Sequence, residues 1–265
     1  MHRRAFIRKA LQWSLTGWLG LTGALTLPLR ALASAASPSF ARIALIIDDV
    51  GFSRRVIKPF LAIPAELTFS VLPHLQFSNL LAHEINSHGF EILLHQPMEP
   101  FDPLVDPGPG AVYVRDRSER IEDMLANNIQ AVPHAVGVNN HMGSRFTSSR
   151  REIQIALQTI KREGLFFIDS LTSNRSCAYL TARHINMATG RRNAFLDNTR
   201  HPANIIQRLY HLVDHALLTG AAIGIGHPFP ETAIGIRQFC SEIQGTGVHI
   251  VPVSEVLAHT ESVHL

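Results

Sequence analysis

The chain has few of the residues that build disulfide scaffolds or aromatic binding grooves. Its 265 residues include 2 cysteines, 3 tyrosines and 2 tryptophans, and both tryptophans, Trp13 and Trp18, lie near the N-terminus. Two cysteines far apart in the sequence, Cys177 and Cys240, cannot form a disulfide framework, and their spacing leaves a single bridge between them open. Because sugar rings usually stack on large aromatic side chains, the shortage of tryptophan and tyrosine argues against a long carbohydrate groove.

Motifs of three common catalytic designs are also missing from the sequence. No G-x-S-x-G motif follows an apolar segment, which argues against a serine nucleophile of the hydrolase type. Neither cysteine directly follows a predicted strand, and there is no glycine-rich phosphate-binding loop of the P-loop type. The chemistry of this chain is therefore expected from other residue types.

The first 33 residues have the pattern of a secretory signal. Arg3 and Arg4 open a basic segment, an apolar segment covers 11–29, and Ala31-Leu32-Ala33 resembles a cleavage site. The paired arginines favour the twin-arginine route, which exports folded proteins. Glycines and a proline interrupt the apolar segment and favour cleavage over a retained membrane anchor. We therefore expect residues 1–33 to be removed and the protein to be periplasmic or secreted, without a stable membrane span.

Removal of this segment changes the charge of the protein. Five of the 24 basic residues, and none of the 21 acidic ones, precede Ala33. The rest of the chain has 19 basic and 21 acidic residues, a net charge of −2 with histidine neutral. The basic isoelectric point of the whole chain belongs to the signal, so the charge does not predict a nucleic-acid-binding or anionic-membrane surface.

Segment 41–258 is expected to form one α/β domain in which strands and helices alternate. Apolar segments predict strands at 42–48, 66–72, 90–95, 134–139, 165–169, 222–226 and 248–253, with a weaker one at 194–197. Helices are predicted at 53–62, 76–88, 117–130, 149–163, 202–219 and 232–244. This alternation predicts about seven parallel strands with right-handed crossovers, which favours a closed or nearly closed barrel over an open sheet.

Polar side chains follow the predicted strands, at the ends where parallel sheets carry chemistry. These side chains are Asp48 and Asp49 after the first strand, then His95, Asn140, His141, Asp169 and His227. Asp49 has an alternative role as the cap of the helix predicted at 53–62, and a lone histidine at a strand end is often structural. Five such ends on one rim favour a functional site, because burying many polar groups without a task is costly.

Carboxylates and imidazoles gathered in this way suit metal-assisted hydrolysis. Three protein ligands commonly hold a divalent ion, here expected to be Zn²⁺, and leave one position for water. The ion lowers the pKa of that water and polarises the scissile carbonyl. A second carboxylate then takes the proton of the water, and a histidine returns a proton to the leaving group.

Four segments extend this prediction to a known family: Ile46-Ile47-Asp48-Asp49-Val50-Gly51, Leu94-His95-Gln96-Pro97-Met98-Glu99-Pro100, Asn140-His141-Met142-Gly143-Ser144 and Gly224-Ile225-Gly226-His227-Pro228-Phe229-Pro230-Glu231-Thr232. They resemble the divergent polysaccharide deacetylases, the YibQ-like family, over essentially all of 41–258. The resemblance implies a distorted (β/α) barrel related to the metal-dependent polysaccharide deacetylases. It also implies that Asp48 is the catalytic base, Asp49 and His95 are metal ligands, and His227 is the catalytic acid.

The sequence departs from the pattern of those enzymes at three places. Glu99 stands where a second metal-binding histidine is expected, so either Glu99 or His141 completes the ligand set. The Arg-Pro-Pro-Tyr-type motif is replaced by the segment that contains Asn140, and the aspartate–tryptophan motif is reduced to Asp169-Ser170. We expect Asp169 and Asn140 to orient the site. His227 has a nearby carboxylate in Glu231, which either fixes its tautomer or simply begins a helix.

Three hypotheses of function follow. The first is an exported, metal-dependent hydrolase that removes an acetyl group from an N-acetylated sugar or peptidoglycan-derived fragment. The second is a non-catalytic carbohydrate- or partner-binding envelope protein that keeps the barrel and the metal site. The third is a purely structural envelope protein. The sequence does not predict the oligomeric state or the exact substrate.

Overall fold

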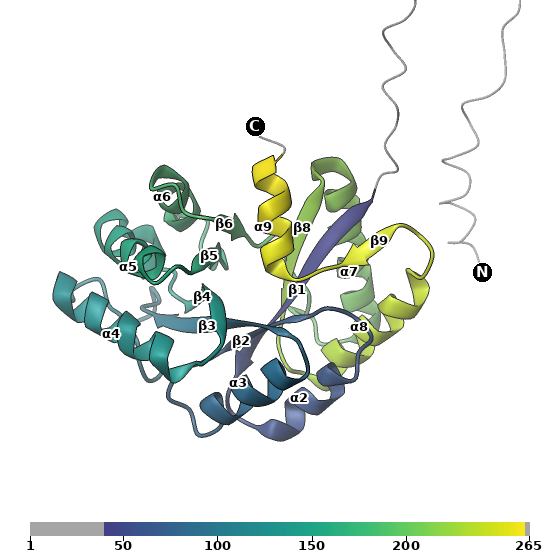
Figure 1. Ribbon diagram of the computed structural model, residues 1–265, viewed down its shortest axis with the longest axis horizontal. Helices are drawn as coiled ribbons and strands as arrows, with labels where there is room; N and C mark the ends of the chain where they lie inside the picture. The colour runs from purple at the N-terminus through teal and green to yellow at the C-terminus, as the bar shows by residue number, and fades with distance from the viewer. Residues whose placement is uncertain (1–39, 263–265) are drawn as a thin grey trace, which may run out of the picture. The chain divides into compact units, whose positions relative to one another are not determined.

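One parallel sheet organises residues 40–262, which are the residues described by this computed structural model (Figure 1). They belong to one compact unit. The predicted signal at 1–33 lies outside the described residues. Within 40–262, no helix is both long enough and apolar enough to span a membrane.

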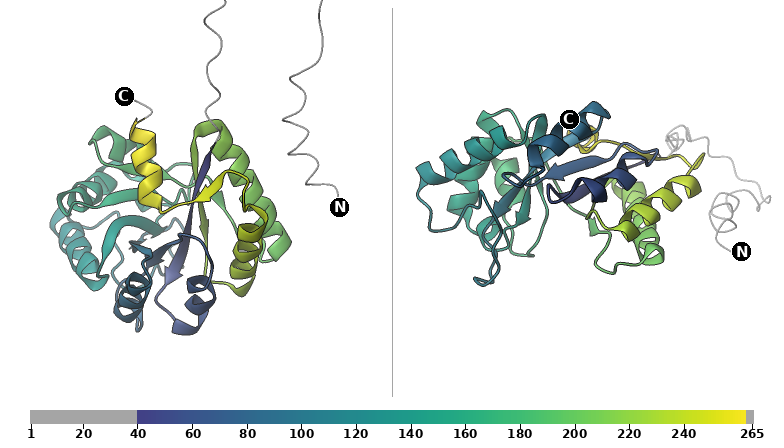
Figure 2. Two further views of the ribbon diagram at one scale, coloured as in Figure 1. Left: turned by 45° about the vertical axis from the view of Figure 1, so that its right-hand side comes forward. Right: turned by 90° about the horizontal axis from the view of Figure 1, so that it is seen from below.

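The sheet has nine strands, and every pair of neighbours runs parallel. Eight strands follow the order β6-β5-β4-β3-β2-β1-β8-β7, and β9 pairs with the start of β1. Their bounds are β1 Ala41–Val50, β2 Thr68–Val71, β3 Glu91–Met98, β4 Ala135–Met142, β5 Phe166–Asp169, β6 Thr189–Arg191, β7 Ala194–Phe195, β8 Ala221–Gly226 and β9 Val248–Ile250. The sheet curls into a half-barrel (Figure 2), which confirms the predicted barrel-like α/β fold.

Most of the helices surround the outer face of the curled sheet (Figures 1 and 2). They are α2 Arg54–Leu61, α3 Ser78–Ser87, α4 Ser118–Ala131, α5 Arg150–Arg162, α6 Ala178–His184, α7 Pro202–Thr219 and α8 Pro230–Glu242, with a short 3₁₀ helix, η1 Phe146–Ser148. The last helix, α9 Val253–Ser262, instead packs against β1 and β8 at the inner face.

Alternation along the strands separates two apolar cores. In β1, Ile43, Leu45 and Ile47 pack in the large outer core with the surrounding helices, while Ala44 and Ile46 pack in a smaller inner core. The inner core also includes apolar residues of α9. Successive side chains of a strand point to opposite faces, so the first strand supplies both cores at once. This explains why its sequence is apolar at nearly every position.

The structure corrects the sequence prediction in several short elements. The predicted strand 248–253 ends at Ile250, and the helix α9 begins at Val253. Helix α6 and strand β6 are not predicted, because seven and three residues are too short for a clear periodic pattern. Both cysteines are free thiols, so Cys177 and Cys240 do not form the bridge that their spacing left open.

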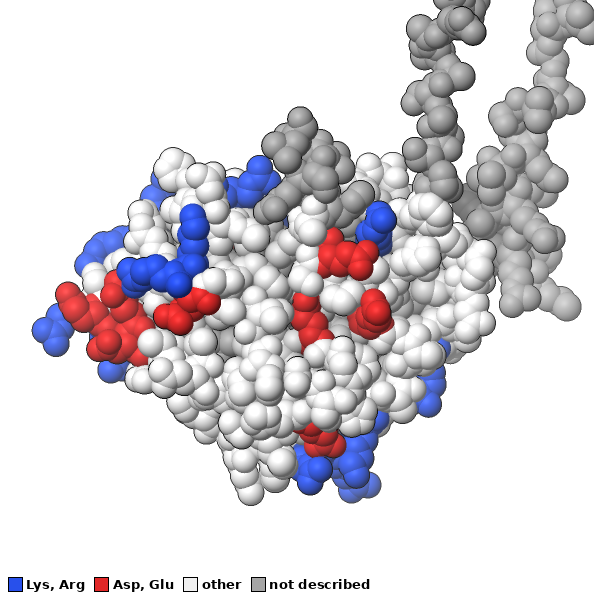
Figure 3. Space-filling view, in the orientation of Figure 1, with Lys and Arg blue, Asp and Glu red and all other residues white. Residues whose placement is uncertain are grey.

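The charges on one face of the molecule are shown in Figure 3. Acidic side chains lie near the centre of this face, and basic ones lie around its rim, including the edge formed by α4, α5 and α6 (Figures 1 and 3). At this edge basic and acidic residues are interleaved, and Arg162 of α5 pairs with Glu122 of α4 at 3.3 Å. Neighbouring charges there are therefore partly neutralised.

Candidate metal centre and active site

The site lies at the carboxyl ends of the strands and continues the inner face of the sheet. Four of its side chains come from β1, β3 and β4 and from the residue that follows β8: Asp48, His95, Asn139 and His227. Asp48, His95 and His227 each stand two positions after a residue of the inner core, respectively Ile46, Leu93 and Ile225. Side chains two positions apart on a strand point to the same face of the sheet. These three polar side chains therefore lie on the inner face, beyond the inner core, and converge at one place.

A bulge in β1 brings the second aspartate to the same place. The backbone φ of Asp49 is +57°, and the pairing with β2 shifts by one residue between Ile47 and Val50. An extra residue of this kind re-aims a side chain that would otherwise point to the opposite face. As a result Asp48 Oδ2 and Asp49 Oδ1 lie 3.6 Å and 3.2 Å from His95 Nε2. The alternative role of Asp49 as a helix cap is wrong, because Ser53 caps α2.

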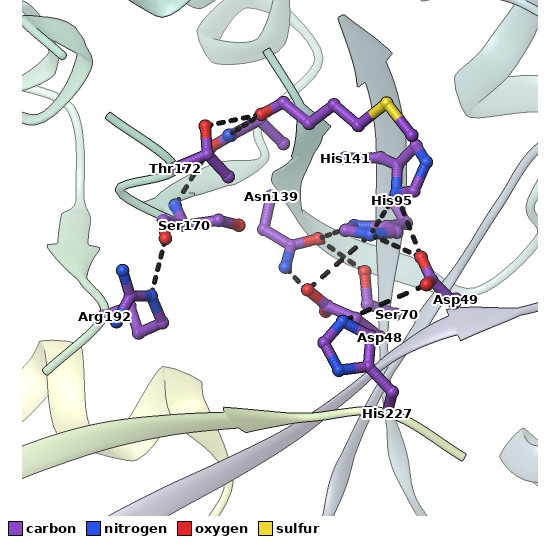
Figure 4. A network of polar contacts seen from close by, with 12 residues as sticks. Asp48, Asp49, Ser70, His95, Asn139, His141, Ser170, Thr172, Arg192 and His227 are labelled. Carbon is purple, nitrogen blue, oxygen red and sulfur yellow. Dashed lines mark hydrogen bonds and ion pairs between the residues drawn. The ribbon is translucent and has the colours of Figure 1, made fainter. Parts of the chain in front are cut away.

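Three donor atoms converge as the ligands of a metal ion would. Asp49 Oδ1, His95 Nε2 and His141 Nδ1 are separated by 3.2, 2.9 and 3.1 Å (Figure 4). Ligand atoms at the usual 2.0–2.2 Å from a tetrahedral Zn²⁺ lie about 3.3 Å apart. Asp49 Oδ1 is buried and forms no hydrogen bond of suitable geometry, although both ring nitrogens are close. These residues therefore fit a divalent metal ion.

Asn139 links His95 to the buried carboxylate of Asp48. Its amide oxygen lies 2.7 Å from His95 Nδ1 and accepts a hydrogen bond from the Ser70 hydroxyl. Its amide nitrogen donates to Asp48 Oδ1 at 2.8 Å (Figure 4). When His95 carries its proton on Nδ1, this bond leaves the Nε2 lone pair facing Asp49 and His141.

The two adjacent aspartates have different electrostatic environments. Burial raises the pKa of Asp48, and the opposing fields of His95 and His227 do not cancel this effect. Burial would also raise the pKa of Asp49, but contacts with His141 and His95 lower it well below its usual range. Asp49 is therefore held as a carboxylate, while Asp48 is the better proton acceptor of the two.

His227 is held by a carboxylate that the sequence analysis did not identify. His227 Nδ1 lies 3.0 Å from Asp197 Oδ1, and its backbone N–H donates to Asp197 Oδ2 at 2.6 Å. The Thr232 hydroxyl donates to the same oxygen. Burial lowers the pKa of His227, but Asp197, Asp48 and Asp49 more than offset this and raise it to about 9. The ring is therefore protonated near neutral pH, and its Nε2 lies 3.9 Å from Asp49 Oδ2.

One pattern in the sequence points to Asp197. Asp197 is the last residue of the strand predicted at 194–197, and in the structure it lies two positions after the end of β7. Glu231, the carboxylate nearest to His227 in sequence, lies in the first turn of α8. The carboxylate that contacts His227 Nδ1 is therefore Asp197 and not Glu231.

Asn140 and Asp169 lie close to the centre but shape the loops around it. Asn140 accepts a hydrogen bond from Ser170 N and donates to the carbonyl oxygen of Met142. Asp169 accepts from Leu171 N and Tyr179 N and from the Ser176 hydroxyl. The side chain of β4 that contacts Asp48 is Asn139 and not Asn140, because neighbouring residues of a strand point to opposite faces.

Glu99 lies at the start of the long loop between β3 and α4, and both of its carboxylate oxygens have partners. Its Oε1 pairs with Arg145 Nη1 at 3.0 Å, and its Oε2 accepts from Val114 N at 2.7 Å. Of the two residues that the sequence left open as third ligand, His141 is the one grouped with Asp49 and His95.

A family model for the divergent polysaccharide deacetylases matches residues 45–257. The chain belongs to this family. The protein YibQ of Escherichia coli strain K12 is 33% identical over 215 residues, which cover 80% of this chain and 66% of that protein. A Haemophilus influenzae protein is 29% identical over 222 residues, 82% of this chain and 79% of that protein. The chain thus spans just under two thirds of the length of the E. coli relative.

Solved structures share the fold of this member of the family. The protein ATU2773 of Agrobacterium tumefaciens aligns with a TM-score of 0.79 and 27% identity, over 82% of this chain and 89% of that one. BA3943 of Bacillus anthracis, described as a CE4 family pseudoenzyme, aligns with a TM-score of 0.51 and 15% identity, over 83% and 66% of the two chains. The second likeness concerns the fold alone.

Proposed function

We propose that this protein is an exported, metal-dependent hydrolase that removes the acetyl group from an N-acetylated sugar. The observation that carries the proposal is the convergence of two groups at one end of the half-barrel. One group is the donor set Asp49, His95 and His141, and the other is a buried carboxylate, Asp48, with a protonated histidine, His227. Together they supply a metal site, a base and an acid. The predicted signal at 1–33 supports a periplasmic or secreted location.

Asp49, His95 and His141 would hold the metal ion, proposed to be Zn²⁺ because two imidazoles and a carboxylate are typical ligands of a catalytic zinc site. When bound, the ion would polarise the acetyl carbonyl and lower the pKa of the attacking water. Asn139 keeps the Nε2 atom of His95 directed at this position through its contact with Nδ1.

Asp48 takes the proton of the attacking water. Its Oδ1 already accepts a hydrogen bond from Asn139, so Oδ2 is the oxygen that receives the proton. Burial raises the pKa of Asp48, which makes this carboxylate a stronger base than an exposed aspartate. In this proposal the two adjacent carboxylates have different tasks: Asp49 is a metal ligand and Asp48 is the base.

His227 supplies the proton that the departing amine needs. Its Nδ1 faces Asp197 and its Nε2 faces Asp49, so the proton leaves from Nε2. The carbon–nitrogen bond of the amide breaks, acetate forms, and the amine nitrogen of the sugar takes the proton from His227. Asp197 stabilises the charged ring until this transfer.

A second candidate is a non-catalytic carbohydrate-binding envelope protein that keeps the barrel and the metal site. It is favoured by the departures from the motif pattern of the active enzymes, above all the reduction of the aspartate–tryptophan motif to Asp169-Ser170. Calorimetry separates the two candidates. Sugar binding that is unchanged in His227→Ala, together with absent turnover in the wild type, would support the binding protein.

The proposal is tested with N-acetylglucosamine oligomers, with and without added zinc, by measuring the amine that is released. Zinc-dependent turnover is expected. Asp48→Asn should lower it about 10²–10⁴-fold, because the variant loses the general base. Zinc affinity should persist in this variant, because Asp48 lies outside the three-residue ligand group. Turnover that needs no metal, or that Asp48→Asn leaves unchanged, would contradict the proposal.

A further inference from the structure

Two arginine–phenylalanine pairs lie next to the ring of His227. The ring centroids of Phe195 and Phe229 lie 6.0 Å and 5.7 Å from that of His227. The guanidinium of Arg192 lies 3.7 Å from the centroid of Phe195, and that of Arg200 lies 3.7 Å from the centroid of Phe229. Each aromatic neighbour of the proposed acid therefore carries a cation on its ring.

Arg192 is held in place by neutral groups and not by an ion pair. Its Nε donates to the carbonyl oxygen of Ser170 at 2.7 Å (Figure 4). Its Nη2 donates to the carbonyl oxygen of Leu171 at 2.8 Å. Burial lowers the pKa of Arg192, and the fields of Asp169 and Asp48 raise it. Among the side chains of residues 40–258, no carboxylate lies within 4.0 Å of this guanidinium.

The acidic groups that face Arg192 are engaged elsewhere. Both oxygens of Asp169 accept hydrogen bonds within its own loop, and Asp48 Oδ1 accepts from Asn139. A partly buried cation is stabilised by a directly bonded anion, and the guanidinium group is well suited to bind one. The Nη1 atom of Arg192 makes none of the hydrogen bonds found among the described residues.

The position of this positive charge indicates which part of a substrate it meets. His227 is the proposed donor to the departing amine, so groups beside His227 face the sugar and not the acetyl group. Arg192 lies on the ring of Phe195 and Arg200 on the ring of Phe229, and both of these rings lie beside that of His227. An anionic group on the amino sugar would pair with the guanidinium of Arg192. The candidate metal ligands and Asp48 would keep their positions.

We propose, on the basis of the deacetylase function proposed above, that the substrate is an N-acetylated sugar carrying an anionic substituent, and that Arg192 selects it. Arg200 adds a second positive charge at the same wall. The anion is a carboxylate or a phosphate, and both would be bound through the same guanidinium. Neutral N-acetyl sugars would then be the poorer substrates of this protein.

The test compares sugars that differ only in charge. N-acetylmuramic acid is paired with its methyl ester, and N-acetylglucosamine 6-phosphate is paired with N-acetylglucosamine. For the zinc-loaded full-length protein we expect kcat/KM to be about ten- to a hundredfold higher for one of the anionic sugars than for its neutral partner, the range of a hydrogen bond to a charged group. The pair that shows the larger ratio identifies carboxylate or phosphate as the preferred anion. Equal values within both pairs would overturn the inference.

Variants assign the preference to Arg192. Arg192→Gln should reduce the ratio toward one, mainly through KM, and Arg192→Lys should keep part of it because the charge remains. Arg191→Gln is the matched control, since Arg191 stacks on Tyr179 at 5.5 Å and not on a ring beside His227. A ratio that survives in Arg192→Gln would overturn the assignment, and equal melting temperatures would show that the loops bonded to Arg192 are intact.

Binding measurements keep this inference separate from the proposed catalysis. If no sugar is turned over, the deacetylase proposal fails, and calorimetry of the same sugar pairs still measures the selectivity for charge. Tighter binding of an anionic sugar than of its neutral partner, lost in Arg192→Gln, would support the inference. Equal binding would overturn it. Turnover of all four sugars at equal rates would overturn the inference alone.

Discussion

The Nδ1 atom of His95 lies 2.7 Å from the amide oxygen of Asn139, and this contact leaves the other ring nitrogen, Nε2, to face the candidate metal site. The same asparagine donates to Asp48 at 2.8 Å, so one side chain orients both a proposed ligand and the proposed base. A residue that holds a metal-binding histidine typically contributes 10–100-fold to metal affinity.

We therefore predict that Asn139→Leu lowers the affinity for zinc by about 10–100-fold. The leucine removes the acceptor for His95 Nδ1 and the donor to Asp48 Oδ1 while roughly keeping the volume. Titration calorimetry of the metal-free protein with zinc measures the effect. Asn204→Leu, on the exposed side of α7, is the control and should bind zinc as the wild type does. Equal affinities of Asn139→Leu and wild type would show that the orientation of His95 does not depend on this bond.

Asp197→Asn should lower the pKa of His227 toward the ordinary histidine value of 6.5. In the folded wild type, contacts with Asp197 help to raise the pKa of His227 to about 9. The pair therefore stabilises the fold fully below pH 6.5, and this stabilisation is lost as the pH rises through 9. The measurements are the NMR titration of the His227 ring in the metal-free protein and urea unfolding between pH 6 and 10.

Glu231→Gln is the control for this measurement, because Glu231 is not among the groups that raise the pKa of His227. Its unfolding free energy should fall with pH as that of the wild type does, while Asp197→Asn should show a smaller fall. If the pKa of His227 falls in Glu231→Gln and is unchanged in Asp197→Asn, the carboxylate that raises it is Glu231 and not Asp197.

The sequence was sufficient to predict which strand ends meet, but not the exact residue at each of them. Asn139 and Asn140 are adjacent asparagines on one strand, and a shift of one residue exchanges the faces to which they point. His141 lies two positions after Asn139 and shares its face, which is the one sequence relation that favours Asn139. Glu99 is four residues after His95, as a second ligand would be, but it pairs with Arg145, which is far from it in sequence.

Other parts of the site depend on backbone features that sequence patterns do not show. Asp49 reaches the centre because of a bulge with a positive φ, which no apolar periodicity encodes. Asp197 follows a strand of only two residues, too short for alternation to be recognised. The long strands β1, β3 and β4 were predicted well, because buried parallel strands have continuous apolar sequences.

Gly137→Ala should destabilise the protein by about 1–3 kcal/mol, the usual cost of inserting a methyl group into a packed core. A Cβ atom at Gly137 in β4 would lie 2.4 Å from the ring of Phe166 in β5, so the ring must move. Urea unfolding measures the change. The neighbouring Val136 is 44% exposed, so Val136→Ala should change stability by only about 0.5 kcal/mol. Equal stability of Gly137→Ala and wild type would show that the Phe166 ring yields without cost.

The choice between His141 and Glu99 as third ligand can be decided without a substrate. Zinc that binds only the folded state raises the unfolding free energy by about 2.7 kcal/mol at a hundred times its dissociation constant, and a chelator removes the gain. His141→Ala and Asp49→Asn should lose most of the zinc-dependent rise in melting temperature, because each removes one of the three converging donor atoms. Glu99→Gln should keep it, since Glu99 is bonded to Arg145 and Val114. A zinc response that disappears in Glu99→Gln and persists in His141→Ala would instead place the ion beside the long loop.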